Sequence, residues 1–125
     1  MSMVMDDYRK GWALRYLREA KAELTVAQRM PPMASSKVLE SLRKAQAAIY
    51  YSLGEPLSVE LIVQQTLGDQ SVNDPILRCL VEIERTVQRI AQTPKPNSEK
   101  AIQEAGEILQ IASDIVELFT GERVN

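Results

Sequence analysis

The chain has 125 residues, of which 45% are hydrophobic and 26% are charged, and its formal net charge at pH 7 is -2. These values are those of an average globular protein, and they exclude the disordered class, whose chains are poor in apolar residues. The sequence contains no histidine and one cysteine. Imidazole catalysis, a histidine metal site and an intramolecular disulfide are therefore excluded. The length predicts a single domain over residues 1–125.

The charge is unevenly distributed along the chain. Residues 1–54 contain nine Lys and Arg against five Asp and Glu, whereas residues 55–125 contain six against twelve. No run approaches the roughly 18 apolar residues that a membrane span needs, and the first residues are too polar for a secretory signal. We therefore expect a cytoplasmic protein without membrane contact, in which Cys79 is an ordinary buried thiol.

Apolar residues recur at intervals of three and four in the first two predicted helices, as on a helix with one buried side. The first helix is expected over residues 6–30, where a Pro-Pro pair ends it, because proline lacks an N–H and restricts the residue before it. Ser35 or Ser36 is expected to cap the second helix. That helix runs to Gly54, which fits the left-handed position after a helix.

A short third helix is predicted from the cap candidate Ser58 to Leu67. After a polar turn, Asp74 is expected as a cap and Pro75 as the first residue of the fourth helix, which has the cleanest apolar stripe of the chain. The stripe consists of Ile76, Leu80, Ile83, Val87 and Ile90.

A proline-rich break at residues 93–98, which contains Pro94 and Pro96, separates the fourth helix from the fifth, at residues 101–119. The apolar arc of the fifth helix is unusually wide, so we expect it to lie centrally in the bundle. No alternation of period two indicates a strand. The predicted fold class is all-α, an up-and-down bundle of four long helices plus one short helix.

Carboxylates are the remaining candidates for metal chemistry. Four acidic residues of the fifth helix resemble, in spacing, the clusters that hold magnesium in all-α nucleotide pyrophosphatases. At about 100° per residue they gather opposite the main apolar stripe, so we predict a solvated surface, with no metal and no other cofactor. The metal-site alternative comprises Glu104, Glu107, Asp114 and Glu117.

Aromatic and basic residues alternate in the N-terminal half. Three aromatic residues of the first helix follow at intervals of four, and two tyrosines near the end of the second helix each lie seven residues after a Lys or Arg. Such side chains complete a core or a subunit interface, stack on nucleotides or nucleic acid, or contact another protein. This candidate interaction face comprises Tyr8, Trp12, Tyr16, Arg43, Lys44, Tyr50 and Tyr51.

The run KAQAAIYYSLG, from Lys44 to Gly54, resembles the second helix of HEPN domains. These domains are small bundles that often begin with a helix containing a tryptophan, and the first predicted helix of this chain contains Trp12. The helix at residues 101–119 is similar to their last helix. The ribonuclease members depend on an Arg followed four to six residues later by His, and this chain lacks that pattern. The resemblance implies the non-catalytic branch, whose members bind nucleotides, nucleotidyltransferase partners or themselves, and no functional residue is carried over.

The predicted function is a non-enzymatic helical module for interaction or nucleotide binding, acting as a homodimer, with a protein partner or a nucleotide as ligand. One alternative is a metal-dependent all-α nucleotide pyrophosphohydrolase, which inward-pointing carboxylates would favour. Another is a small helical subunit of a complex that handles nucleic acid, which a continuous basic face on the first two helices would favour.

Overall fold

The computed structural model describes residues 6–95 and 97–124, and 83% of these residues lie in helices, with no strand among them. The predicted all-α bundle is confirmed. Pro96, part of the predicted break, lies outside the described residues. The helices are α1 (Asp7–Arg29), α2 (Ala34–Leu53), α3 (Pro56–Thr66), α4 (Pro75–Gln92) and α5 (Ser98–Thr120), and a 3-10 turn (Pro31–Met33) joins α1 to α2.

Four of the helices begin at a side chain that accepts a hydrogen bond from a backbone N–H of the first turn, which satisfies a donor without a partner inside the helix. The predicted cap Asp74 is confirmed, but Ser58 is not a cap. Pro56 occupies the first turn of α3, so the preceding Glu55 is placed to receive the N–H of Ser58. The cap pairs are Asp6 with Tyr8 (2.7 Å), Glu55 with Ser58 (2.9 Å), Asp74 with Leu77 (2.9 Å) and Asn97 with Lys100 (3.2 Å).

Two further predicted helix ends were wrong. Neither Ser35 nor Ser36 caps α2, because the 3-10 turn leads directly into Ala34 and the Ser36 hydroxyl donates back to the carbonyl of Met33 (3.2 Å). Gly54 follows α2 with a φ of 175°, which is extended backbone rather than left-handed. Among the described residues, the left-handed conformation occurs at Gly121, which ends α5 with a φ of 79°.

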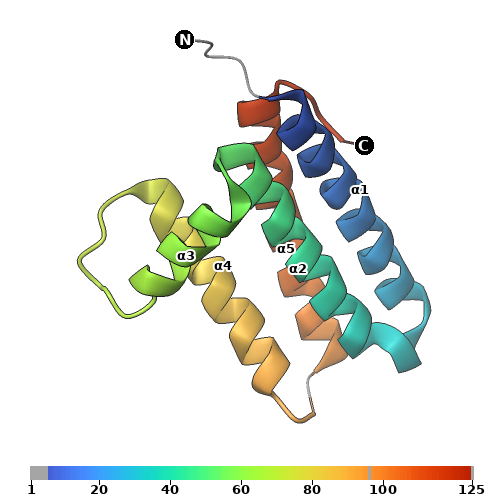
Figure 1. Cartoon of the computed structure of the whole chain (residues 1–125). Coiled ribbons are helices and arrows are strands. Elements are labelled where there is room, and N and C mark those ends of the chain that lie inside the picture. Colours follow the sequence, from blue (N-terminus) through green and yellow to red (C-terminus); the bar gives the residue numbers. More distant parts are fainter. Residues whose placement is uncertain (1–5, 96, 125) are drawn as a thin grey trace.

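Helix α2 is the centre of the molecule, with α1, α3, α4 and α5 arranged around it (Figure 1). The prediction that α5 is central was therefore wrong, since α5 packs mainly against α1 and α2. All five helices contribute to one apolar core. Fully buried members include Leu17, Leu42, Ile49, Val63, Val87 and Val116.

Helices α4 and α5 diverge from the loop that joins them (Figure 1). Near that loop, Arg89 of α4 forms an ion pair with Glu104 of α5. Farther from it, α4 packs against α3 and its following turn, where Arg85 donates to the carbonyl of Leu67. This divergence leaves one side of the C-terminal half of α5 uncovered, so that Ile111, Leu118 and Phe119 are exposed.

Candidate interaction surface

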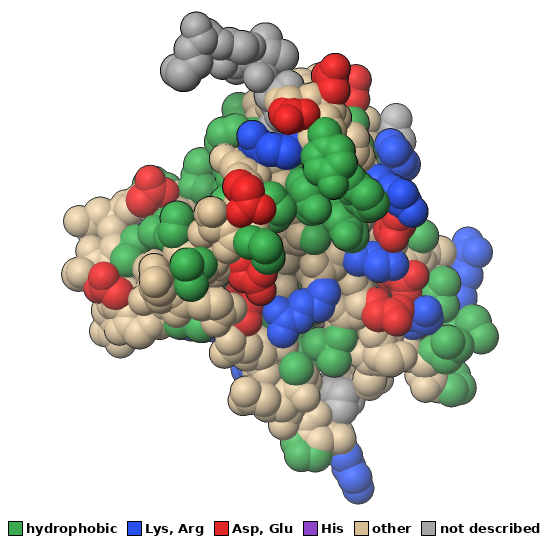
Figure 2. Space-filling view, viewed as in Figure 1, with side chains coloured by type: hydrophobic (Ala, Val, Ile, Leu, Met, Phe, Trp, Pro, Cys, Tyr) green, Lys and Arg blue, Asp and Glu red, His purple; other side chains and the backbone are tan. Residues whose placement is uncertain are grey.

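Four aromatic rings gather where the first half of α1 meets the end of α2. The Tyr51 ring of α2 stacks on Trp12 and Tyr16 of α1, with centroid distances of 6.2 and 5.7 Å. Trp12 also contacts Tyr16 (5.5 Å) and the edge of Tyr8 (6.3 Å), which is 65% exposed. We call Tyr8, Trp12, Tyr16 and Tyr51 the aromatic surface. Figure 2 shows a hydrophobic patch in this part of the molecule.

Two arginines of α1 hold the aromatic surface in place. Arg9 donates to the carbonyls of Tyr51 (3.1 Å) and Ser52 (3.4 Å), which belong to the last turn of α2 and have no acceptor role within the helix. The end of α2 is thereby attached to α1, which brings Tyr51 onto Trp12. The guanidinium carbon of Arg15 lies 5.0 Å from the centroid of the Trp12 ring, in a cation–π contact.

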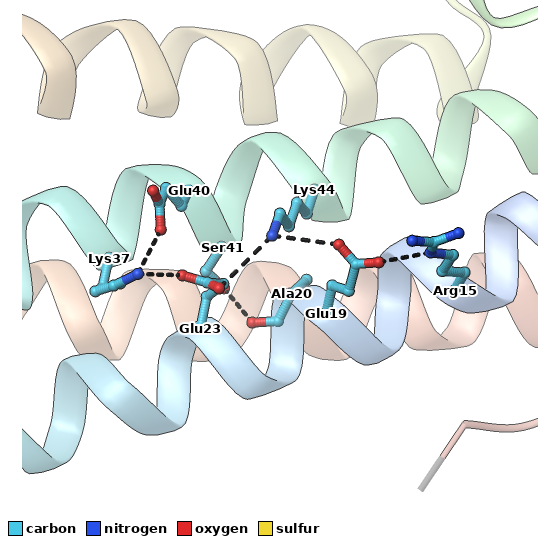
Figure 3. Close-up of polar contacts among 8 residues, drawn as sticks. All are labelled: Arg15, Glu19, Ala20, Glu23, Lys37, Glu40, Ser41 and Lys44. Atoms are coloured by element: carbon cyan, nitrogen blue, oxygen red, sulfur yellow. Dashed lines mark hydrogen bonds and ion pairs between the residues drawn. The ribbon is translucent and has the colours of Figure 1, made fainter.

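Charged side chains of α1 and α2 alternate in sign along the junction of the two helices (Figure 3). Each charged side chain inside the row lies between two side chains of the opposite charge. The pairs are Arg15–Glu19 (2.9 Å), Glu19–Lys44 (3.3 Å), Lys44–Glu23 (3.6 Å), Glu23–Lys37 (3.1 Å) and Lys37–Glu40 (3.0 Å). We call these six residues the charge ladder.

Lys44, which lies seven residues before Tyr51 in the sequence, forms ion pairs within the charge ladder. Although burial acts to lower the pKa of Lys44, the hydrogen bond to Glu19 and the charge of Glu23 raise it. Hydrogen bonds from Arg15 and Lys44 lower the pKa of Glu19. Acidic and basic side chains are interspersed on the face shown in Figure 2. The described part of α1 and α2 therefore has no continuous basic face of the kind that favours nucleic acid.

Arg43 and Tyr50 lie elsewhere on α2, beside a buried carboxylate of α4. Glu84 is only 3% exposed. Its carboxylate accepts hydrogen bonds from Arg43 (3.0 Å), Gln46 (2.7 Å) and Gln88 (2.8 Å). The second N–H of Gln46 points to the Tyr50 hydroxyl at 3.5 Å. A cavity of about 130 Å³ adjoins this group. We call it the Glu84 cluster.

The Glu84 cluster is electrostatically satisfied. Burial alone raises the pKa of Glu84, but hydrogen bonds from Gln46 and Gln88 and the charge of Arg43 outweigh burial and lower it. Burial, together with the charges of Glu84 and Glu60, raises the pKa of Tyr50 to about 12. At neutral pH the cluster thus holds an ionised carboxylate beside a protonated phenol, an arrangement that joins α2 to α4.

Glu84 was not identified as a site residue from the sequence. The signal was present in the apolar stripe of α4, since Glu84 lies four residues after Leu80 and three before Val87, both buried. A lone acid inside such a stripe needs partners from another helix.

The four acids of α5 do not converge. Glu104 pairs with Arg89 of α4, and Glu117 pairs with Arg123 at 2.5 Å. Glu107 and Asp114 are exposed. Within residues 6–95 and 97–124, no group of three or more Asp, Glu or Cys side chains is arranged to hold a metal ion.

Cys79 is half-buried rather than fully buried, and burial raises the pKa of its thiol. The protonated form, which is a poor nucleophile, is therefore favoured.

Across residues 6–95 and 97–124, the helices are too short or too polar to span a lipid bilayer. No family model, curated protein or solved structure matches this chain.

Proposed function

We propose that this chain is a non-enzymatic helical interaction module that forms a homodimer through its aromatic surface. The observation that carries the proposal is the stacked group of Trp12, Tyr16 and Tyr51 with Arg15 over the Trp12 ring. Trp, Tyr and Arg are the residues most enriched at the energetic centres of protein interfaces. Here they are partly exposed, and Arg9 attaches the end of α2 to α1, which reduces the conformational entropy lost on association.

A second copy of the chain suits this surface because its centre is uncharged and its edge contains both signs. Arg15 and Glu19 lie one turn apart on α1, next to the rings. Two α1 helices that approach in opposite directions can therefore exchange these charges across a two-fold axis. The non-catalytic HEPN branch, to which the run from Lys44 to Gly54 is similar, includes self-associating members, and this likeness supports the same proposal.

Nucleotide binding was also predicted from the sequence as an alternative to protein interaction, and the same rings could stack on a base. A phosphate group would then need a free cation nearby. Lys44 is shared between Glu19 and Glu23, and Arg43 lies in the Glu84 cluster. The charges around the rings therefore favour a protein surface over a phosphate-bearing ligand.

The oligomeric state tests the proposal. Sedimentation velocity at tens of micromolar should show a dimer for the natural sequence and a monomer for Trp12→Ala/Tyr51→Ala. The matched control is Leu57→Ala/Leu61→Ala, which removes two exposed leucines from α3 and should remain dimeric. A monomeric natural protein, or a control that dissociates equally, would contradict the proposal.

Tryptophan fluorescence distinguishes self-association from nucleotide binding. Trp12 is the only tryptophan, so its emission reports on the aromatic surface alone. Dilution through the dissociation range should shift this emission, whereas added ATP or single-stranded RNA should not change it in a saturable way. Saturable quenching by ATP that disappears in Tyr51→Ala would instead favour a nucleotide-binding module.

A further inference from the structure

The C-terminal half of α5 carries an apolar strip that is only partly covered, since Ile115 packs against the core while its neighbours on the strip are exposed. Ile111, Ile115 and Leu118 follow at intervals of four and three, and Phe119 completes the strip in the last turn. Leu118 is 74% exposed and Ile111 is 38% exposed. We call these four residues the α5 strip. Clustered exposure of large apolar side chains marks a site of association.

The strip lies away from α1. Gly106, Leu109 and Ser113 of α5 line the groove shared with α1. At about 100° per residue, Ile111 and Leu118 project from the opposite edge of α5. That edge would face α4 in an ideal bundle, but α4 diverges towards α3 (Figure 1). The α5 strip and the aromatic surface of α1 and α2 are therefore separate surfaces.

One edge of the strip is acidic. Glu107 lies one turn before Ile111, and Asp114 lies one turn before Leu118, on the same side of α5, and both carboxylates are exposed. Among the described residues, neither carboxylate has a Lys or Arg within ion-pair distance. Helix α5 as a whole contains five acidic residues and one lysine. A ligand that matches this surface would have apolar side chains opposite the strip and positive charge opposite Glu107 and Asp114.

We propose that the α5 strip docks an amphipathic helix of a partner protein, with Lys or Arg beside its apolar residues. The apolar side chains of such a helix would fill the strip, and its cations would lie against Glu107 and Asp114. The strip spans nine residues, from 111 to 119, or about 12 Å along α5, which corresponds to two to three turns of a partner helix. The proposal extends the interaction function above, but it does not depend on the dimer.

A second copy of the chain fits this strip poorly. A two-fold axis that pairs two antiparallel α5 helices brings the same edge of each helix together, so the exposed Asp114 carboxylates would oppose one another. Like charges across an interface weaken association. The charge pattern therefore selects a basic partner for the α5 strip and leaves self-association to the aromatic surface.

Three synthetic helical peptides of 18 residues test the proposal with the full chain. The first has Leu at i, i+4, i+7 and i+11 with Lys on both flanks, the second replaces each Lys by Glu, and the third is a scrambled form of the first. Fluorescence anisotropy should show at least about tenfold tighter binding of the first peptide than of either other peptide, because both apolar and charged contacts are required.

Variants of the protein locate the binding. Ile111→Gln/Leu118→Gln should weaken binding of the basic peptide at least about tenfold, while Leu57→Gln/Leu61→Gln on α3 should not change it. Glu107→Lys/Asp114→Lys should reverse the preference towards the acidic peptide. Glu60→Lys/Glu82→Lys changes the net charge equally and should keep the original preference. Circular dichroism confirms folding, since all the changed residues are at the surface.

Four outcomes would overturn the proposal. They are equal binding of the basic and acidic peptides, equal binding of the scrambled peptide, an unchanged affinity in Ile111→Gln/Leu118→Gln, and loss of the dimer in that variant. The last outcome would assign a second copy to the α5 strip. A monomeric natural protein that still prefers the basic peptide would reject the proposed dimer and retain the α5 docking site.

Discussion

The α1–α2 pair and the α4–α5 pair are both antiparallel helices, but the first is closely packed and the second diverges. Alanines line the first pair on both sides, and the buried Ser41 hydroxyl donates to the backbone carbonyl of Ala20 at 2.7 Å. Small side chains let two helix axes approach closely. The buried alanines are Ala13, Ala20 and Ala27 of α1 and Ala34, Ala45 and Ala48 of α2.

In the α4–α5 pair, the described buried residues of α4 are Leu, Val and Ile together with Glu84. Larger side chains keep helices farther apart, and Glu84 directs α4 towards Arg43 and Gln46 of α2 rather than towards α5. Among the described residues, one ion pair, Arg89–Glu104, links α4 to α5, whereas three ion pairs of the charge ladder link α1 to α2. Residue size and the placement of charges therefore decide which helix pair closes and which leaves apolar side chains exposed.

The largest expected effect is the loss of a core side chain next to the closely packed pair. Leu42 is fully buried on α2, so Leu42→Ala should lower the free energy of unfolding by about 2–5 kcal/mol. Leu61→Ala on the exposed side of α3 should change it by less than about 0.5 kcal/mol. Urea denaturation followed by circular dichroism measures both. Similar losses in the two variants would mean that α3 is covered in solution.

Overpacking tests the close approach of α1 and α2 directly. Ala20 is fully buried where its carbonyl receives Ser41, so Ala20→Leu should lower the free energy of unfolding by about 1–3 kcal/mol. The same change at the exposed Ala91 of α4 should have little effect. The measurement is again a urea midpoint. A stable Ala20→Leu protein would show that the two helices are not packed closely.

The Glu84 cluster makes the stability of the α2–α4 contact depend on pH. Because the folded pKa of Glu84 is below its ordinary value of 4.5, its ionised form contributes stability that is present above pH 4.5 and is lost as pH falls through the folded pKa. Glu84→Gln should be less stable by about 1 kcal/mol at pH 7. That difference should shrink in denaturation series towards pH 3. A constant difference across this range would contradict an ionised Glu84.

The smallest expected effect concerns the charge ladder. Its side chains are partly exposed, so Lys44→Met should lower the free energy of unfolding by only about 0.2–1 kcal/mol, and 1 M NaCl should reduce the difference. Parallel urea titrations at low and high salt provide the test. A larger, salt-independent loss would show that the ladder, rather than the alanine contacts, holds α1 against α2.

The amino-acid sequence was sufficient to predict the helices and most of their ends. The apolar spacing within each helix, the cap at Asp74 and the prolines act over a few residues, so local physical chemistry is sufficient to place them. The ends that were wrong, at Ser35 or Ser36, at Ser58 and at Gly54, depended on the neighbouring backbone conformation.

Contacts between helices could not be predicted from these local patterns. The pattern around α2 gave Tyr50 and Tyr51 similar roles, yet Tyr51 joins the aromatic surface and Tyr50 lies beside Glu84. The wide apolar arc of α5 indicated a central helix, but one edge of it is exposed because α4, whose Glu84 is hydrogen-bonded to α2, diverges from α5. Periodicity determines which side of a helix is apolar, whereas the size and charge of residues distant in sequence determine what covers that side.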